Sequence, residues 1–238
     1  MARTNCLNSL NNRDDNFITV ELTMRSCLLA MTLVSFVVAA DPKVHPISFD
    51  KADLGKLPAG WTAAKTGEGE GSVWKVTADD SAPGKPGHVL TQTAAGPNRL
   101  YNLCVRDESS FLDGDLTVRV KAIAGEIDQG GGLVWRYLDA NNYYVCRYNP
   151  LEKNFRLYTV KQGKRKELAS KEKIELKKAK EFAVSVKHIG SKIVCELDGE
   201  HKLEVTDETF PKPGKVGLWT KADAVTSFDK LGIHPKPF

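Results

Sequence analysis

The chain has 238 residues, of which 41% are hydrophobic and 27% are charged. This composition is typical of a globular protein that is long enough to form one large domain with its own hydrophobic core. The 34 basic residues exceed the 30 acidic residues by a formal net charge of only +4. Such a small excess does not indicate nucleic-acid binding, so we expect no nucleic-acid partner.

The first 40 residues predict a segment that is removed from the mature protein. Arg25 precedes an apolar run that ends at Val38, and two alanines follow before Asp41. This is the pattern of a secretory signal peptide, and its apolar core is too short to span a membrane. We therefore expect a mis-called extension at 1–23, a signal peptide at 24–40 and a single secreted or periplasmic domain at 41–238.

Strand signals recur along the rest of the chain. Short apolar or alternating runs are separated by turns rich in Gly, Pro, Asn and Asp, at intervals of about 8–12 residues. The expected strands are 45–50, 72–77, 89–93, 101–106, 115–123, 133–138, 143–148, 155–160, 182–188, 192–197, 201–205, 214–221 and 225–233. This series of short strands predicts an all-β sandwich or barrel.

Residues 167–182 are the exception, because their composition favours a helix. No apolar face recurs there at helical spacing, and strands are expected on both sides, so we predict no helix. We interpret the lysines between Lys161 and Lys180 as a solvated sheet edge that resists edge-to-edge pairing. The alternative is a docking surface for an acidic polysaccharide.

Residues 128–158 predict a three-stranded antiparallel meander that follows three consecutive glycines. Alternation gives each strand one arginine among large apolar neighbours, so Arg136, Arg147 and Arg156 are expected to share one sheet face. Aromatic rings suit the apolar faces of a sugar, and guanidinium groups suit its hydroxyls or carboxylates. The alternative is a solvated face on which arginine stems lie over aromatic rings.

Four segments of the chain resemble a known superfamily. They are Phe49–Asp50 before a loop that leads to Trp61, GGGLVWR at 130–136, DANNYYVCR at 139–147, and GKVGLWTKADAVTSFDKLGI at 214–233. The chain resembles the concanavalin A-like lectin/glucanase superfamily, in particular small secreted bacterial domains related to the 3-keto-disaccharide hydrolase family, which are labelled family 16 glycoside hydrolase-like. The resemblance implies a jelly-roll sandwich of two antiparallel sheets with one concave, ligand-bearing face. It does not determine an activity.

The resemblance also implies which residues would contact a carbohydrate ligand. Those expected on the concave face are Arg136, Tyr144, Arg147, Arg156 and Tyr158, with Trp219 and Lys221 at its rim. For Trp219 the alternative is a ring buried in the core.

Family 16 enzymes carry a Glu-x-Asp-x-Glu strand whose two glutamates perform retaining hydrolysis. Here Glu126 and Asp128 match the first two positions, but Gly130 stands where the second glutamate should be. Ordinary retaining hydrolysis is therefore not expected. Elimination from a 3-keto-glycoside needs one general base, for which Glu126, Asp128 or His188 are candidates, with Arg136 stabilising the enolate oxygen. His188 is otherwise expected to be an exposed residue in a hairpin turn.

Calcium is the ion that the resemblance implies, because an oxygen-lined site often joins the first and last strands of such sandwiches. Asp50 and Asp229 occupy those positions and carry the carboxylates that calcium prefers. The alternative is that both are aspartates at turns or strand edges.

Three cysteines follow the expected signal peptide: Cys104, Cys146 and Cys195. Their number is odd and their spacing does not match a zinc site. Either one disulfide and one free thiol, or three buried free thiols, would be consistent with the sequence.

The sequence therefore predicts a secreted jelly-roll domain that binds carbohydrate. One alternative is an enzyme, either a hydrolase or lyase acting on 3-keto-glycosides or a divergent glycoside hydrolase. The other is a structural or adhesive module without a small ligand.

Overall fold

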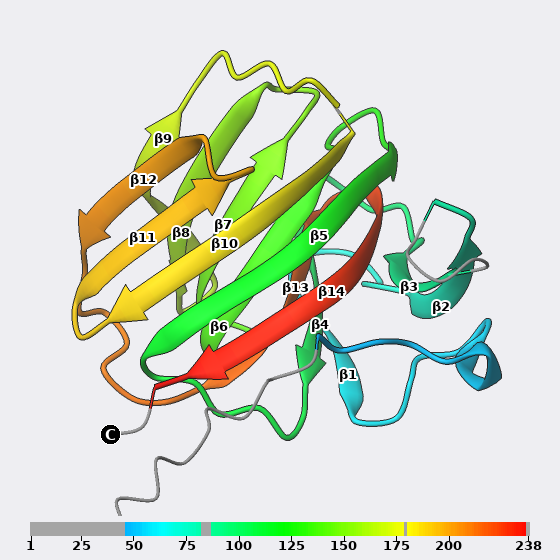
Figure 1. Cartoon of the computed structure of the whole chain (residues 1–238), viewed down its shortest axis with the longest axis horizontal. Coiled ribbons are helices and arrows are strands. Elements are labelled where there is room, and N and C mark those ends of the chain that lie inside the picture. The colour runs from blue at the N-terminus through cyan, green and yellow to red at the C-terminus, as the bar shows by residue number, and fades with distance from the viewer. Residues whose placement is uncertain (1–45, 82–86, 179, 237–238) are drawn as a thin grey trace, which may run out of the picture. The chain divides into compact units, whose positions relative to one another are not determined.

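The computed structural model describes residues 46–81, 87–178 and 180–236 (Figure 1). The expected extension at 1–23 and signal peptide at 24–40 lie outside these residues. Within the described part, two antiparallel seven-stranded sheets pack face to face. The predicted all-β jelly-roll sandwich is confirmed.

We name each sheet after its central strand. The β6 sheet contains, in spatial order, β1 (Trp61–Gly67), β4 (Leu100–Arg106), β13 (Lys215–Lys221), β6 (Gly131–Asp139), β7 (Asn142–Asn149), β8 (Asn154–Lys161) and β9 (Lys164–Lys171). The β5 sheet contains β12 (His201–Thr206), β11 (Lys192–Leu197), β10 (Glu181–Ile189), β5 (Gly114–Ala124), β14 (Val225–Pro235), β3 (Gly87–Gln92) and β2 (Trp74–Asp79).

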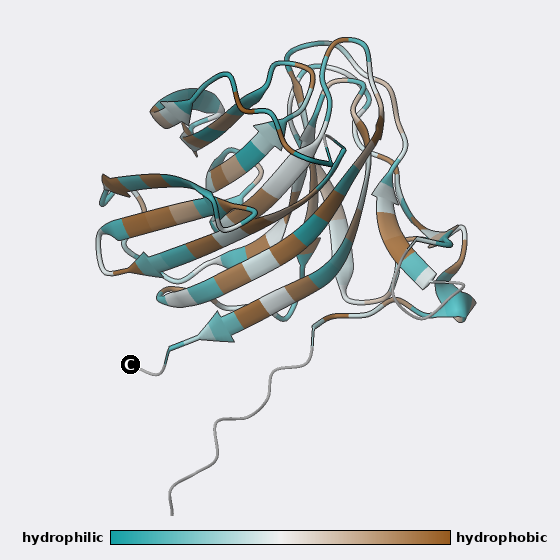
Figure 2. Ribbon diagram, turned by 45° about the horizontal axis from the view of Figure 1, so that its top comes forward, coloured by the Kyte–Doolittle hydropathy of each residue, from teal (hydrophilic) through white to brown (hydrophobic). Residues whose placement is uncertain are grey.

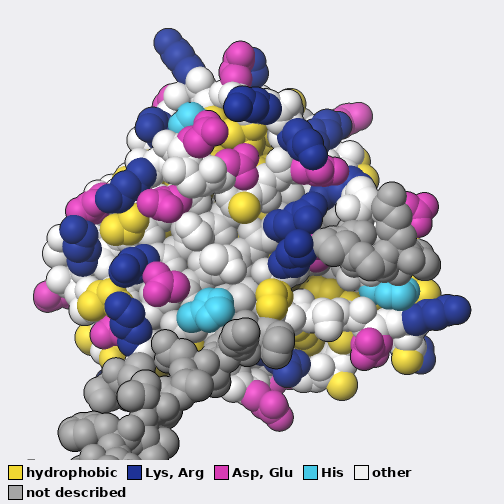
Figure 3. All heavy atoms as spheres, in the orientation of Figure 1, with side chains coloured by type: hydrophobic (Ala, Val, Ile, Leu, Met, Phe, Trp, Pro, Cys, Tyr) yellow, Lys and Arg dark blue, Asp and Glu magenta, His cyan; other side chains and the backbone are white. Residues whose placement is uncertain are grey.

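Alternation along the strands builds the core between the two sheets (Figure 2). In β5, Val118 and Val120 are buried, while the alternating Arg119 and Lys121 point away from the core. Side chains from the β6 sheet meet them, among them Leu133, Trp135, Cys146, Leu157 and Leu218. The opposite side of the β5 sheet faces solvent, and Figure 3 shows basic and acidic side chains interspersed with uncharged ones on it.

The predicted meander is confirmed as β6–β7–β8. Val145 pairs with Tyr158, and Arg147 pairs with Arg156, which is the register expected from the alternation. Gly132 must be a glycine, because a Cβ there would lie 2.0 Å from the carbonyl oxygen of Cys146.

Two strands were not predicted, and one predicted strand does not form. The missed strands are β1 and the lysine-rich β9, which lie at the two edges of the β6 sheet. An edge strand pairs on one side only, so it needs fewer apolar residues and gives a weaker sequence signal. In the expected strand 45–50, the described residues form a single bridge between Ile47 and Leu231, and the short 3₁₀ helix η1 (Lys51–Asp53) follows.

The prediction that 167–182 contains no helix is confirmed for its described residues, which lie in β9, an irregular segment and the start of β10. All three cysteines of the domain are buried and free, which matches the second of the two alternatives. Among the described residues, no helix has the length and apolar composition that a membrane crossing requires.

Candidate functional site

The β6 sheet is apolar on both of its faces. The side chains that alternate with the core residues form a second buried cluster on the side away from the β5 sheet, which we call the outer face. Its members are Leu103, Val105, Val134, Tyr143, Val145, Tyr158, Val160 and Trp219. A sheet face turned away from the core is normally polar, so an apolar outer face marks a surface with a further role.

The outer face is concave. The guanidinium carbon of Arg165, on β9, lies 5.0 Å from the ring centre of Tyr101, on β4. These strands are five positions apart, which would separate them by roughly 24 Å in a flat sheet. A second contact agrees, because the Thr66 hydroxyl on β1 lies 2.7 Å from the Tyr143 hydroxyl on β7. The sheet must curl so that its two ends approach each other across this face.

Three arginines surround Tyr158 on the outer face. Arg147 and Arg156 donate hydrogen bonds to the Tyr158 hydroxyl, at 3.3 and 3.5 Å. The guanidinium carbon of Arg165 lies 4.4 Å from the centre of the Tyr158 ring, within the range of a cation–π contact. The three arginines come from β7, β8 and β9, so adjacent strands bring them together.

Two of these arginines are neutralised by carboxylates. Arg147 pairs with Glu152 at 3.0 Å and also donates hydrogen bonds to Asn154. Arg156 pairs with Glu172 at 3.0 Å and with Glu167 at 3.4 Å. Arginine and carboxylate therefore alternate along this side of the face, where Tyr101, Arg156 and Arg165 are partly exposed and Tyr158 and Arg147 are buried.

One end of the outer face contains a buried ion pair. Lys221, at the end of β13, lies 2.8 Å from Asp128 in the loop between β5 and β6. Burial raises the pKa of Asp128, and the nearby positive charges of Arg147 and Lys221 oppose that rise. The Asp223 carboxylate holds this loop by accepting hydrogen bonds from the backbone N–H groups of residues 126–128.

Solved structures share this architecture. The structure of the carbohydrate binding module CBM66 from Bacillus subtilis aligns with a TM-score of 0.57 and 18% identity, covering 72% of this chain and 93% of that chain. The chain has the concanavalin A-like jelly-roll fold. A Bacillus subtilis protein of unknown function with a galectin-like fold aligns with a TM-score of 0.51 and 11% identity, covering 73% and 88%. At these identities the similarity shows the fold alone.

No family model matches the chain, and a search of curated proteins gives no match either. The more specific resemblance to 3-keto-disaccharide hydrolases therefore remains a prediction.

Within this jelly roll, the structure brings five of the seven predicted ligand residues to the outer face. They are Arg147, Arg156, Tyr158, Trp219 and Lys221. Trp219 is fully buried and packs against Tyr101 in a tilted arrangement, with ring centres 5.4 Å apart, so it lies in the floor of the face rather than at its rim. Whether these residues contact a ligand is still a prediction.

Tyr144 was expected on the concave face, and the structure places it on the opposite side of the sheet. Its ring stacks on Trp135 between the two sheets, with ring centres 5.5 Å apart. Its hydroxyl donates a hydrogen bond to Asp207. The alternation along β7 explains the error, because Tyr144 and Arg147 are an odd number of residues apart and must point to opposite faces.

Arg136 does not share a face with Arg147 and Arg156 either, because a β-bulge interrupts β6. Arg136 has the left-handed φ of 43° and is buried. Its guanidinium donates hydrogen bonds to the carbonyl oxygens of Leu112, Phe210 and Gly190, and it pairs with Asp113 at 3.2 Å. It ties three loops together at one end of the sandwich, beside an open depression of about 370 Å³.

The two candidate catalytic acids have different environments. Glu126 is exposed, whereas Asp128 is buried in its pair with Lys221. His188 was expected to be exposed, and that expectation is wrong. It is fully buried between the sheets, where its Nδ1 accepts a hydrogen bond of 2.9 Å from Trp135. Burial lowers the pKa of His188 to about 4, and the nearby Arg136 adds to this effect.

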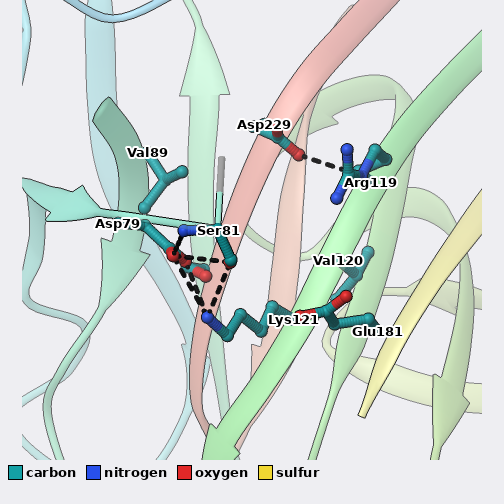
Figure 4. Close-up of a pocket in the computed structure, with 9 residues that line it drawn as sticks. Asp79, Ser81, Val89, Arg119, Val120, Lys121, Glu181 and Asp229 are labelled. Carbon is teal, nitrogen blue, oxygen red and sulfur yellow. Dashed lines mark hydrogen bonds and ion pairs between the residues drawn. The ribbon is translucent and has the colours of Figure 1, made fainter. Parts of the chain in front are cut away.

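Asp50 and Asp229, the predicted calcium ligands, have different environments. Asp50 is exposed and precedes η1, whereas Asp229 lies 3.7 Å from Arg119 on the outer side of the β5 sheet (Figure 4). Among the described residues, no three His, Cys, Asp or Glu side chains gather at a metal-binding distance. Calcium binding stays a prediction, with the added condition that an ion at Asp229 must compete with Arg119.

Arg165 is the residue on the outer face that was missed from the sequence. It lies in the lysine-rich segment that we interpreted only as a solvated edge. One signal was present, because it is the single arginine between Lys161 and Lys180. Its partner Tyr101 could not be inferred, since the contact depends on the curvature of the whole sheet.

Proposed function

We propose that the chain is a carbohydrate-binding module that holds a glycan on the outer face of the β6 sheet. The observation that carries this proposal is the concave arrangement of the partly exposed Tyr101, Arg156 and Arg165 above the buried Tyr158 ring. Tyrosine rings can stack on the apolar faces of a pyranose, while guanidinium groups can donate to its hydroxyls. Sugar sites combine these two kinds of group in a recessed surface.

Two other recessed surfaces fit a glycan less well. The depression beside Asp229 on the β5 sheet has a volume of about 20 Å³, enough for about one water molecule. The larger depression at the end of the sandwich is lined by Arg136, whose donors already bind carbonyl groups of the chain. The outer face retains aromatic surface and partly exposed arginines.

A glycan array tests the proposal, followed by titration of the best ligand. The chain should bind at least one oligosaccharide, and Tyr101→Ala should weaken that binding by tenfold or more, because it removes both the apolar area of the ring and a stacking contact worth about 0.5–1.5 kcal/mol beyond that area. Arg119→Ala, on the opposite sheet, is the control and should leave the affinity unchanged. Binding that depends on Arg119 and not on Tyr101 would place the site elsewhere.

We further propose that the protein acts outside the cytoplasm, in the medium or the periplasm, as the signal-like pattern at 24–40 suggests. Cell fractionation with an antibody against the domain tests this. Finding the uncleaved chain only in the cytoplasmic fraction would contradict it.

One observation favours an enzyme as the second candidate. Asp128 is a buried carboxyl with a raised pKa close to Arg147, and perturbed acids of this kind are found at catalytic sites. Such a group could remove the acidic proton beside the ketone of a 3-keto-glycoside. Incubation with 3-keto-disaccharides and mass spectrometry of the products decides the point, with Asp128→Asn as the inactive comparison. Binding without any product would remove this candidate.

A further inference from the structure

Arg165 differs from the other arginines of the outer face in what surrounds its charge. Its guanidinium lies near two tyrosine rings, with 4.4 Å to the ring centre of Tyr158 and 5.0 Å to that of Tyr101. Among the described residues, no carboxylate lies within ion-pair distance of it. Its Nη1 atom is buried and has no hydrogen-bond partner.

This combination is costly for a guanidinium. A buried donor without an acceptor costs about 1–3 kcal/mol, and a partly buried charge normally has a counter-charge. The tyrosine rings compensate the charge only in part. Arg147 shows the same feature nearby, because its buried Nε also has no partner.

Exposed lysines flank Arg165 along the edge of the sheet. Lys164 and Lys166 flank Arg165 on β9 and Lys161 ends β8; all three are exposed, and none of them forms an ion pair with a described residue, whereas Glu167, two residues after Arg165, is paired with Arg156. Such a lysine cluster raises the local concentration of anions. Since the acids of the outer face are paired with Arg147 and Arg156, the charge that a negatively charged occupant would compensate is that of Arg165.

We infer that the glycan of the outer face is acidic, and that Arg165 binds the carboxylate of a hexuronate residue. This inference rests on the proposed carbohydrate binding. A carboxylate is planar and matches the edge of a guanidinium, and two N–H groups of the guanidinium can bind it at once. A neutral sugar hydroxyl could satisfy the free N–H group, but it would leave the charge of Arg165 uncompensated.

The test compares one oligosaccharide in two forms. The probes are oligogalacturonates and the same oligosaccharides after their carboxyl groups have been reduced to alcohols, both titrated by calorimetry into the full chain. We expect the acidic form to bind at least tenfold more tightly than the reduced form. The affinity for the acidic form should also fall as salt is added, since the contact is between charges.

Variants at one strand position and its neighbour locate the effect. Arg165→Met should remove most of the preference for the acidic form, and Arg165→Lys should retain part of it. Lys164→Met is the matched control, because it removes the same charge from the adjacent exposed position, and it should keep at least half of the preference. Circular dichroism melts show whether each variant is folded.

The outcomes separate the two proposals. Equal binding of both forms, or a preference that survives Arg165→Met and Arg165→Lys in folded protein, would overturn the inference while carbohydrate binding stands. If neither form binds and the glycan array is also empty, the proposed function fails, and the inference fails with it.

Discussion

The ammonium group of Lys221 lies 2.8 Å from one carboxylate oxygen of Asp128, and both side chains are almost fully buried. The other oxygen of Asp128 accepts a hydrogen bond of 3.0 Å from Asn149. A pair in this position contributes little net stability, because burying two charges offsets their attraction. Removing only one member of the pair should destabilise the fold, since the buried charge that remains has lost its partner.

We therefore expect Lys221→Met to lower the free energy of unfolding by about 3 kcal/mol. The double variant Asp128→Asn with Lys221→Met should be more stable than Lys221→Met alone, because no buried charge is left. Urea unfolding of the four proteins in this cycle measures the coupling. Lys187→Met, at an exposed position of β10, serves as the control and should change stability by less than about 0.5 kcal/mol. Additive effects of the two single changes would show that the pair is not coupled.

Arg136 should matter for stability and not for ligand binding. Arg136→Gln breaks hydrogen bonds to carbonyl groups of three separate loops. We expect it to lower the free energy of unfolding by about 3 kcal/mol, as for the loss of one partner of a buried charge. Arg119→Gln, which removes a half-exposed arginine, should have an effect within about 0.5 kcal/mol. Loss of glycan affinity in folded Arg136→Gln would instead assign this residue to the site.

His188 should make the domain less stable in acid. Its pKa is about 4 in the folded chain and 6.5 in the unfolded chain, so the unfolded state binds more protons between these values. The contribution of neutral His188 to the free energy of unfolding is complete above pH 6.5 and is lost as the pH falls towards 4. The total loss is about 3 kcal/mol. Unfolding measured from pH 7 to pH 4 should show this slope.

A variant with an uncharged acceptor isolates the histidine. His188→Asn keeps an oxygen that can accept the Trp135 hydrogen bond, so its stability should depend less on pH in this window. His234→Gln is the control, because His234 is exposed and should leave the slope unchanged. An identical slope in wild type and His188→Asn would show that other groups produce it.

The thiols of Cys104, Cys146 and Cys195 should resist alkylation in the folded chain. All three are buried, and burial raises the pKa of the Cys104 and Cys146 thiols well above its usual range, which suppresses the reactive thiolate. Iodoacetamide followed by peptide mass spectrometry should label these positions only after denaturation. Labelling of Cys104 in native protein would indicate that β4 opens locally.

If a calcium ion binds Asp50 and Asp229, EDTA should lower the melting temperature by several degrees, because a ligand bound only to the folded state stabilises that state. Arg119→Gln would remove the competing guanidinium and should enlarge the effect of added calcium. An unchanged melting temperature with EDTA and with excess calcium, in both proteins, would exclude this site.

The sequence was most informative where structure is decided locally. The alternation in 133–160 and the turn residues between its strands placed Arg147, Arg156 and Tyr158 on one face. The same alternation placed Arg136 on the wrong face, because the bulge that redirects its side chain depends on partners far away in the chain, such as Phe210. A period of two predicts side-chain direction only while the strand remains regular.

The edges of the β6 sheet were the second limit. The composition of β9 is polar, and its pairing with β8 is a tertiary property that no pattern within the segment reveals. The curvature that joins Arg165 to Tyr101 depends on all the strands between them. The sequence could therefore suggest a concave face, but it could not show which residues meet across it.

The end of β13 and the turn that follows it hold the loop that contains Asp128 through two kinds of contact. Lys221 binds the Asp128 side chain, and Asp223, two residues later, binds the backbone N–H groups of residues 126–128. The two segments therefore form one structural unit, although they are far apart in the sequence. In a graft onto another jelly roll, residues 125–129 would have to be moved together with residues 221–224, since either segment alone would carry its unpaired charges into the new host.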